Sequence, residues 1–252
     1  MRLALLAALL CAATPAWADE AQMPEQRRTI TFPSEDGIPV TADLWADPAR
    51  DKPFIVLFHQ AGWSRGEYRQ IAPRLSIMGF NLMAVDLRSG GKVGGVINRT
   101  RAAAAKAGKK TDYVSALPDM RAAIAYARKH HARGKVILWG SSYSAGLVLW
   151  LGARVKADAV LAFAPGEYFR KLGKPRTWVR TAAAKLTMPV FITSARSEHR
   201  SWKAIYAAIP GNNKQSYLPT TRGQHGSRAL WNRFPDSAGY WAAVRKFLDS
   251  AR

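Results

Sequence analysis

Short apolar runs alternate with amphipathic segments along most of the chain. The run from Phe54 to Phe58 is apolar without interruption, as is typical of a strand that is buried on both faces of a sheet. Further strands are predicted at residues 81–87, 135–139, 158–164, 189–193 and 215–218. Apolar residues recur at helical spacing in the segments 68–78, 117–131, 145–154 and 237–250, which predicts a helix in each.

From residue 54 onward the predicted strands and helices take turns. This order is typical of an α/β protein, with a mostly parallel sheet of about eight strands and helices on both faces. Two more strands, 29–34 and 40–46, are expected before it around a Glu35-Asp36-Gly37 turn. In such sheets ligands bind beyond the carboxyl ends of the strands, so we expect the functional residues to follow the strands directly.

The N-terminus has the pattern of a secretory signal peptide. A basic start, Met1-Arg2, precedes an apolar stretch from Leu3 to Ala13, and Ala16-Trp17-Ala18 places small residues at the cleavage positions. We predict a signal peptide over residues 1–18, export to the periplasm or the medium, and a single domain over residues 19–252.

Composition adds two constraints. Cys11 is the single cysteine and lies in the predicted signal peptide, so the exported chain would have no disulfide and no cysteine metal site. Lysine and arginine number 38 against 17 acidic residues, which gives a formal net charge of +21. A basic chain can bind nucleic acid, but no recognition motif is present and export argues against that partner. Beyond the signal peptide no membrane span is predicted.

A serine lies in a tight turn between a predicted strand and a predicted helix. The turn, Gly140-Ser141-Ser142-Tyr143-Ser144, directly follows the strand 135–139. Turns rich in glycine and serine also bind phosphates. This one resembles the nucleophile elbow G-x-S-x-G of the α/β-hydrolase superfamily, with Ser144 in place of the second glycine. The resemblance implies that Ser142 is the nucleophile, whereas Ser144 would lie inside the helix.

The superfamily places an acid and then a histidine after the nucleophile. His225 lies in a glycine-flanked loop after the last predicted strand, which is the superfamily's position for the base. Glu198 follows the strand 189–193 where the superfamily usually has aspartate, and the resemblance implies that it is the acid. Glu167, after the preceding strand, is the competing candidate.

The segment His59-Gln60-Ala61-Gly62-Trp63 follows the first buried strand and is similar to the superfamily's His-Gly-x loop, with Gln60 at the glycine position. The resemblance implies an oxyanion hole formed by the backbone N–H groups of Ala61 and Tyr143, and a structural role for His59. Four aromatic residues that adjoin this loop or follow other strand ends would line a substrate pocket, although packing is the commoner role of such side chains: Trp63, Tyr168, Trp178 and Trp202.

The resemblance covers about residues 30–250 and looks closest to dienelactone-hydrolase-like and small carboxylesterase members, with a small cap or none. It implies a serine hydrolase that cleaves carboxylic esters through an acyl-enzyme on Ser142, without a metal or organic cofactor. Two alternatives stay open. One is a non-catalytic binding protein of the same fold that holds an anionic ligand, and the other is a peptidase or acyltransferase that uses the same triad.

Basic residues are concentrated in two segments, 89–112 and 168–185. Together they hold twelve lysines and arginines and one acid. Both segments begin at the carboxyl ends of predicted strands, so we expect them to border the active site. Such a field would steer anionic substrates or hold the protein on an anionic surface. Solubility is the competing explanation of the charge.

Overall fold

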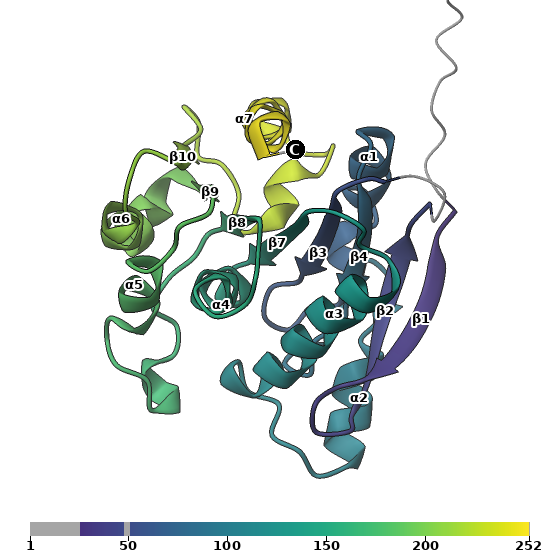
Figure 1. Cartoon of the computed structure of the whole chain (residues 1–252). Helices are drawn as coiled ribbons and strands as arrows, with labels where there is room; N and C mark the ends of the chain where they lie inside the picture. Colours follow the sequence, from purple (N-terminus) through teal and green to yellow (C-terminus); the bar gives the residue numbers. More distant parts are fainter. Residues whose placement is uncertain (1–25, 48–50, 252) are drawn as a thin grey trace, which may run out of the picture.

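The computed structural model describes residues 26–47 and 51–251. The predicted signal peptide, with Cys11 and the cleavage site, lies outside the described residues. Within them, eight strands form one sheet in the order β1-β2-β4-β3-β7-β8-β9-β10 (Figure 1). The β1–β2 and β2–β4 pairs are antiparallel and the other neighbours are parallel. The predicted mostly parallel sheet of about eight strands is confirmed.

The strands of the sheet are β1 (Arg28–Pro33), β2 (Pro39–Trp45), β3 (Phe54–Phe58), β4 (Asn81–Val85), β7 (Val136–Ser141), β8 (Ala159–Phe163), β9 (Val190–Thr193) and β10 (Lys214–Tyr217). A separate pair consists of β5 (Lys92–Val93) and β6 (Val96–Ile97). The α-helices are α1 (Ala72–Ile77), α2 (Arg99–Lys106), α3 (Leu117–His130), α4 (Tyr143–Gly152), α5 (Trp178–Ala183), α6 (His199–Ala208) and α7 (Ser237–Ala251). Short 3-10 helices are η1 (Arg65–Tyr68), η2 (Val114–Ala116), η3 (Arg170–Leu172), η4 (Arg196–Glu198) and η5 (Ser227–Leu230).

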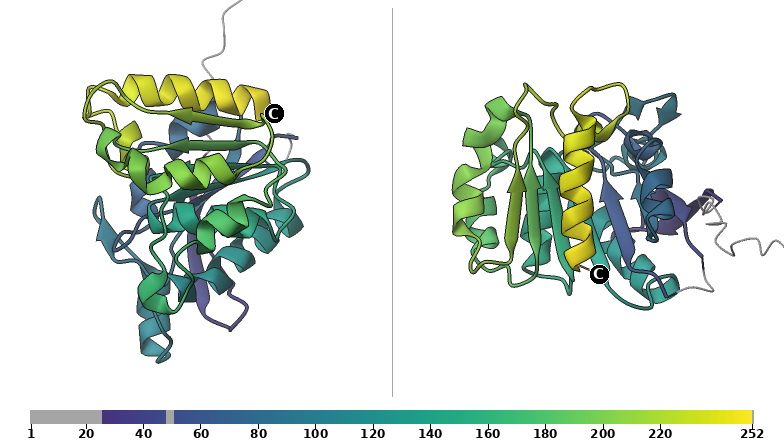
Figure 2. Two further views of the ribbon diagram at one scale, coloured as in Figure 1. Left: turned by 90° about the vertical axis from the view of Figure 1, so that its left-hand side faces the viewer. Right: turned by 90° about the horizontal axis from the view of Figure 1, so that it is seen from above.

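Each face of the sheet has its own hydrophobic core. In β3, Phe54, Val56 and Phe58 pack into one core, and Ile55 and Leu57 pack into the other, because successive side chains of a strand point to opposite faces. Helices α3, α4, α5 and α6 contribute to the first core, while α1 and α7 contribute to the second. Figure 2 shows α7 lying over its face of the sheet. The uninterrupted apolar run of β3 is therefore explained by helices that pack on both faces of the sheet.

Three helices were not predicted from the sequence. The two basic segments, 89–112 and 168–185, contain α2 and α5, and α6 follows the fifth parallel strand. The helix expected at 68–78 is also shorter, since α1 begins only at Ala72. Pro73 lies in its first turn, where the missing N–H of proline costs no hydrogen bond. Helix α2 is capped by the Asn98 side chain, which accepts from the Arg101 N–H (2.8 Å).

The connection from β8 to β9 is short, as expected for a small cap or none. It contains only η3 and the six-residue α5. Helix α5 packs against α4 and α6 and thus belongs to a helical layer of the sheet. Nowhere in residues 26–47 and 51–251 is a helix long and apolar enough to cross a membrane.

Candidate active site

Ser142 occupies a strained turn between β7 and α4. Its backbone angles are φ 60° and ψ −120°, a combination that costs energy for a residue with a side chain. The Ser142 N–H donates to the carbonyl of Phe163 at the end of β8 (2.7 Å). A side chain on Gly140 would come within 2.4 Å of the Ser144 carbonyl oxygen, so only glycine fits there. This is the local geometry that the motif predicts for a nucleophile elbow.

Ser144, the competing nucleophile, is fully buried in α4. Its hydroxyl contacts the carbonyl oxygens of Phe58 (2.8 Å) and Ser141 (2.9 Å). It also accepts from the Ser141 N–H (2.8 Å). These bonds hold the turn together and leave the Ser144 hydroxyl inside the protein.

His225 and Glu198 meet across two loops. Nδ1 of His225 lies 2.5 Å from Oε1 of Glu198. The other carboxylate oxygen accepts from the Ala195 N–H (3.2 Å), which fixes the carboxylate at the end of β9. The two side chains are about 30% exposed (30% and 28%), so the pair lies at the protein surface. The structure therefore brings together the histidine and the acid that the sequence predicts.

Glu167, the competing acid, is engaged elsewhere. Its carboxylate accepts from the N–H groups of Val179 and Arg180, both at 2.8 Å. These are free donors in the first turn of α5, and a carboxylate there also interacts favourably with the helix dipole. Glu167 thus caps a helix, and Glu198 is the acid beside His225.

The predicted oxyanion donors lie at the ends of β3 and β7. Tyr143 is the first residue of α4, so its N–H has no acceptor within the helix. Ala61 follows His59 and Gln60. His59 is fully buried, with Nδ1 donating to the Gln60 carbonyl (2.8 Å) and Nε2 accepting from the Leu87 N–H (2.8 Å). Burial lowers the pKa of His59, in keeping with the neutral, structural role predicted for it.

The four predicted pocket aromatics have different environments. Trp202 is fully buried and its indole N–H donates to the Ser194 hydroxyl (2.7 Å), so it belongs to the core. Trp178 packs on Trp150, with ring centroids 5.0 Å apart. The Tyr168 hydroxyl donates to the Ala164 carbonyl (2.8 Å) and interacts with the Ser142 side chain. Burial raises the pKa of Tyr168 to about 12, so a neutral phenol adjoins the serine.

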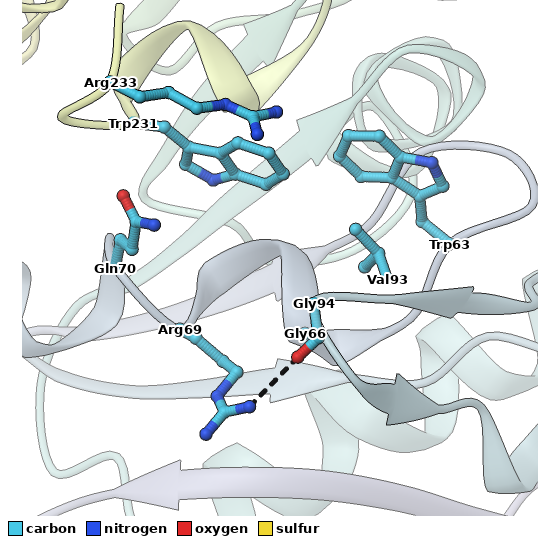
Figure 3. A pocket seen from close by; sticks show the side chains of 8 residues that line it. All are labelled: Trp63, Gly66, Arg69, Gln70, Val93, Gly94, Trp231 and Arg233. Atoms are coloured by element: carbon cyan, nitrogen blue, oxygen red, sulfur yellow. Dashed lines mark hydrogen bonds between the residues drawn. The ribbon is translucent and has the colours of Figure 1, made fainter.

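Trp63 lines a pocket with Trp231, a residue from the segment after His225 (Figure 3). The two indoles stack with centroids 5.4 Å apart, and the cavity measures about 560 Å³. The guanidinium of Arg233 lies 4.6 Å from the Trp231 ring, and Arg69 donates to the Gly94 carbonyl (3.0 Å). The lining holds two arginines and no acidic residue: Trp63, Gly66, Arg69, Gln70, Val93, Gly94, Trp231 and Arg233.

Sequence reasoning missed one buried carboxylate that contacts the neighbours of Ala61 and Ser142. Glu67, in η1, is fully buried and accepts from the Gln60 N–H (2.8 Å) and the Ser141 hydroxyl (2.7 Å). Nothing local marks it, because its burial arises only when the loops after β3, β7 and β10 come together. Among the described residues, no group of three or more His, Cys, Asp and Glu side chains is placed to hold a metal ion.

Comparisons with known proteins place this geometry in a family. The family model described as serine aminopeptidase, S33 matches residues 49–202, more than half of the chain. The chain belongs to this family. It is thus a serine hydrolase, and its α/β-hydrolase fold confirms the resemblance found in the sequence motifs.

Solved structures with the same fold include an esterase of Pyrococcus furiosus and the dienelactone hydrolase of Anabaena variabilis. The esterase is 19% identical, with a TM-score of 0.69 over 90% of this chain and 93% of that chain. The dienelactone hydrolase is 14% identical, with a TM-score of 0.67 over 91% and 99%. The acylaminoacyl peptidase of Pyrococcus horikoshii is 13% identical, with a TM-score of 0.63 over 91% of this chain but 42% of its own. A comparison with curated proteins finds no match.

Proposed function

We propose that this serine hydrolase is an exported esterase that cleaves carboxylic esters through an acyl-enzyme on Ser142. The observation that carries the proposal is the 2.5 Å contact between His225 and Glu198, combined with Ser142 on a strained elbow at the same edge of the sheet. Serine, histidine and an acid in this arrangement form the machinery of acyl transfer on several unrelated folds.

The reaction proceeds in two steps. Oγ of Ser142 attacks the ester carbonyl carbon while Nε2 of His225 takes its proton, and Glu198 stabilises the imidazolium through Nδ1. The N–H groups of Ala61 and Tyr143 bind the oxyanion that forms. The tetrahedral intermediate collapses, and the alcohol leaves with the proton from His225. Water, deprotonated by His225, then attacks the acyl-enzyme and releases the acid and Ser142.

We further propose that the preferred substrates are anionic. The pocket beside Trp63 and Trp231 supports this, because Arg69 and Arg233 line it and no acid does. Indole faces suit flat, apolar groups, and guanidinium groups pair with carboxylates. An aromatic ester that carries a distal carboxylate combines both features. The alternative explanation of the basic surface is attachment to an anionic surface rather than substrate selection.

Two other functions share parts of this site. A peptidase or acyltransferase would use the same triad, and one of the similar structures is an acylaminoacyl peptidase. That peptidase is more than twice as long as the part that this chain matches. A non-catalytic binding protein would not need the Glu198–His225 pair, and this pair therefore favours an enzyme.

Replacement of Ser142 tests the proposal. Ser142→Ala should lower the hydrolysis of p-nitrophenyl esters by about 10⁶-fold, to the level left by binding and the oxyanion hole. A fluorophosphonate probe should label the parent protein and leave Ser142→Ala unlabelled, because the probe reacts only with an activated serine. An esterase activity that survives in Ser142→Ala would overturn the proposed nucleophile. A parent protein that neither hydrolyses esters nor reacts with the probe would favour the binding protein instead.

Export rests on the N-terminal pattern of residues 1–18 alone. Sequencing the N-terminus of the protein recovered from the periplasm or the medium should give Asp19 as the first residue, since signal peptidases cleave after small residues at this spacing. Recovery of the intact N-terminus from the cytoplasm alone would contradict the proposal.

A further inference from the structure

Glu67 is a buried carboxylate that the proposed mechanism does not use. It lies in η1, just after the oxyanion loop, with no measurable exposure to solvent. A buried charged group is costly unless hydrogen bonds compensate it. The partners of Glu67 therefore indicate why the fold retains it.

The partners come from loops that carry three different parts of the site. Oε2 of Glu67 accepts from the N–H of Gln60, the neighbour of the oxyanion donor Ala61 (2.8 Å). Oε1 accepts from the hydroxyl of Ser141, the neighbour of Ser142 (2.7 Å). These two contacts connect the end of β3 with the end of β7.

Ser141 extends the connection to the histidine loop. Its Oγ accepts from the N–H of Ser227, two residues after His225 (2.9 Å). Ser227 is itself held by Trp139, whose indole N–H donates to its hydroxyl (2.9 Å). Gly226, between His225 and Ser227, packs closely on Ser141, because a side chain on Gly226 would come within 2.5 Å of the Ser141 hydroxyl oxygen.

We propose that Glu67 is a positioning residue that holds the oxyanion loop, the nucleophile and the histidine loop in register through Gln60, Ser141 and Ser227. The proposal rests on the function proposed above. In acyl transfer a displacement of about 1 Å can lower the rate about 10²-fold, and each of these three contacts lies within two residues of a reacting group. A residue that only stabilised the fold would have no reason to join these particular loops.

The ionised form of Glu67 matches its surroundings. The Gln60 N–H can only donate, and the Ser141 hydroxyl donates to Glu67 while its oxygen accepts from the Ser227 N–H. A carboxylate accepts both bonds. The amide of Glu67→Gln keeps only one oxygen acceptor, so it can no longer accept from both the Gln60 N–H and the Ser141 hydroxyl, and the connection between their two loops is lost.

The first experiment compares steady-state kinetics of the parent with Glu67→Gln and Ser141→Ala. We expect Glu67→Gln to lower kcat by about 10²-fold, with KM changed less than about threefold because no substrate contact is removed. Ser141→Ala removes the bridge to Ser227 but leaves the Gln60 bond, so its loss of kcat should be smaller. Glu35→Gln is the matched control, since Glu35 is about half exposed and pairs with Arg121 on the surface; its kcat should equal that of the parent.

A pH profile separates positioning from general stability. Burial raises the pKa of Glu67 to about 7. The titratable groups that face it are His225, Tyr68 and Tyr143, and the pKa of each tyrosine is raised above its usual value, so both tyrosines stay neutral. Below pH 7 the parent binds a proton at Glu67 that Glu67→Gln cannot bind, and the protonated carboxyl no longer accepts both hydrogen bonds. The log(kcat/KM) of the parent should therefore fall with a steeper slope toward acid pH than that of Glu67→Gln.

Hydrogen exchange supplies a readout that needs no activity. The amides of Gln60 and Ser227 should exchange faster in Glu67→Gln than in the parent, while amides in β4 should be unchanged. Equal kcat, equal acid slopes or unchanged exchange at these two amides in a folded Glu67→Gln would each overturn the inference. An inactive parent that does not react with the fluorophosphonate probe would instead overturn the proposed function, so the two failures are distinguishable.

Discussion

At the scale of single residues, Glu198 and Glu167 both lie after strand ends but make different contacts. Glu198 meets His225, whereas Glu167 holds the first turn of α5. Both follow a parallel strand, and the sequence alone favours Glu198 as the acid without excluding Glu167. What decides is which backbone donors lie nearby once the loops are folded. Glu167 faces two free N–H groups of a helix, and its carboxylate is already used there.

Paired substitutions test this division. Glu198→Gln should lower kcat by about 10⁴-fold, because the amide can no longer stabilise the imidazolium or hold its tautomer. Glu167→Gln should leave kcat near the parent value and lower the free energy of unfolding by about 1 kcal/mol, the typical worth of a helix-end charge. Kinetics with a p-nitrophenyl ester and urea unfolding measure both effects. If Glu167→Gln proves to be the inactive variant, the acid has been assigned to the wrong loop.

At the scale of elements, the turn from β7 to α4 shows why a serine can stand where the superfamily has glycine. The Ser144 side chain points into the turn and contacts the Ser141 N–H and the carbonyl oxygens of Phe58 and Ser141. It therefore links the elbow to the end of β3. Gly140 has no such freedom, because any side chain there would collide with the helix backbone.

Ser144→Gly, which restores the usual motif, should accordingly be harmful. It removes the hydroxyl contacts, among them the acceptor of the buried Ser141 N–H, and the loss of such an acceptor typically costs about 1–3 kcal/mol. Glycine inside α4 costs up to about 1 kcal/mol more. Thermal and urea unfolding of the variant should show the loss, while fluorophosphonate labelling of Ser142 should persist. A variant as stable as the parent would mean that the Ser144 contacts contribute little.

Much of the architecture was predictable because it depends on local pattern. Continuous apolar runs identified β3 and its parallel neighbours to within about two residues, since a strand buried on both faces requires such a run. Helices α2, α5 and α6 were not predicted because all three begin within polar or basic segments, and α2 and α5 are also short. The site residues followed from motif order, but the burial of Trp202 and the contacts of Glu67 depend on residues distant in the chain.

At the scale of the whole molecule, the fold itself does not require the formal net charge of +21. Of the twelve basic residues in segments 89–112 and 168–185, all except Lys174 are exposed. Each segment starts beside the site, because the Ser89 hydroxyl contacts the Tyr143 hydroxyl and the Tyr168 hydroxyl interacts with the Ser142 side chain. A field of one sign near a site raises the local concentration of oppositely charged substrate, and such a field is screened by salt.

Two esters of nearly equal shape test whether the positive charge steers anionic substrates or only keeps the protein soluble. For the anion 4-acetoxybenzoate, kcat/KM should fall about tenfold as ionic strength rises from about 20 mM to about 500 mM, because the Debye length shrinks from about 20 Å to a few ångströms. For neutral methyl 4-acetoxybenzoate it should change little. Replacing Arg170 and Lys171 with glutamine should flatten the response to salt if the second segment supplies the field, and replacing Lys109 and Lys110 should do so if the first does. Equal salt responses of the two esters in the parent would show that the positive charge does not select the substrate.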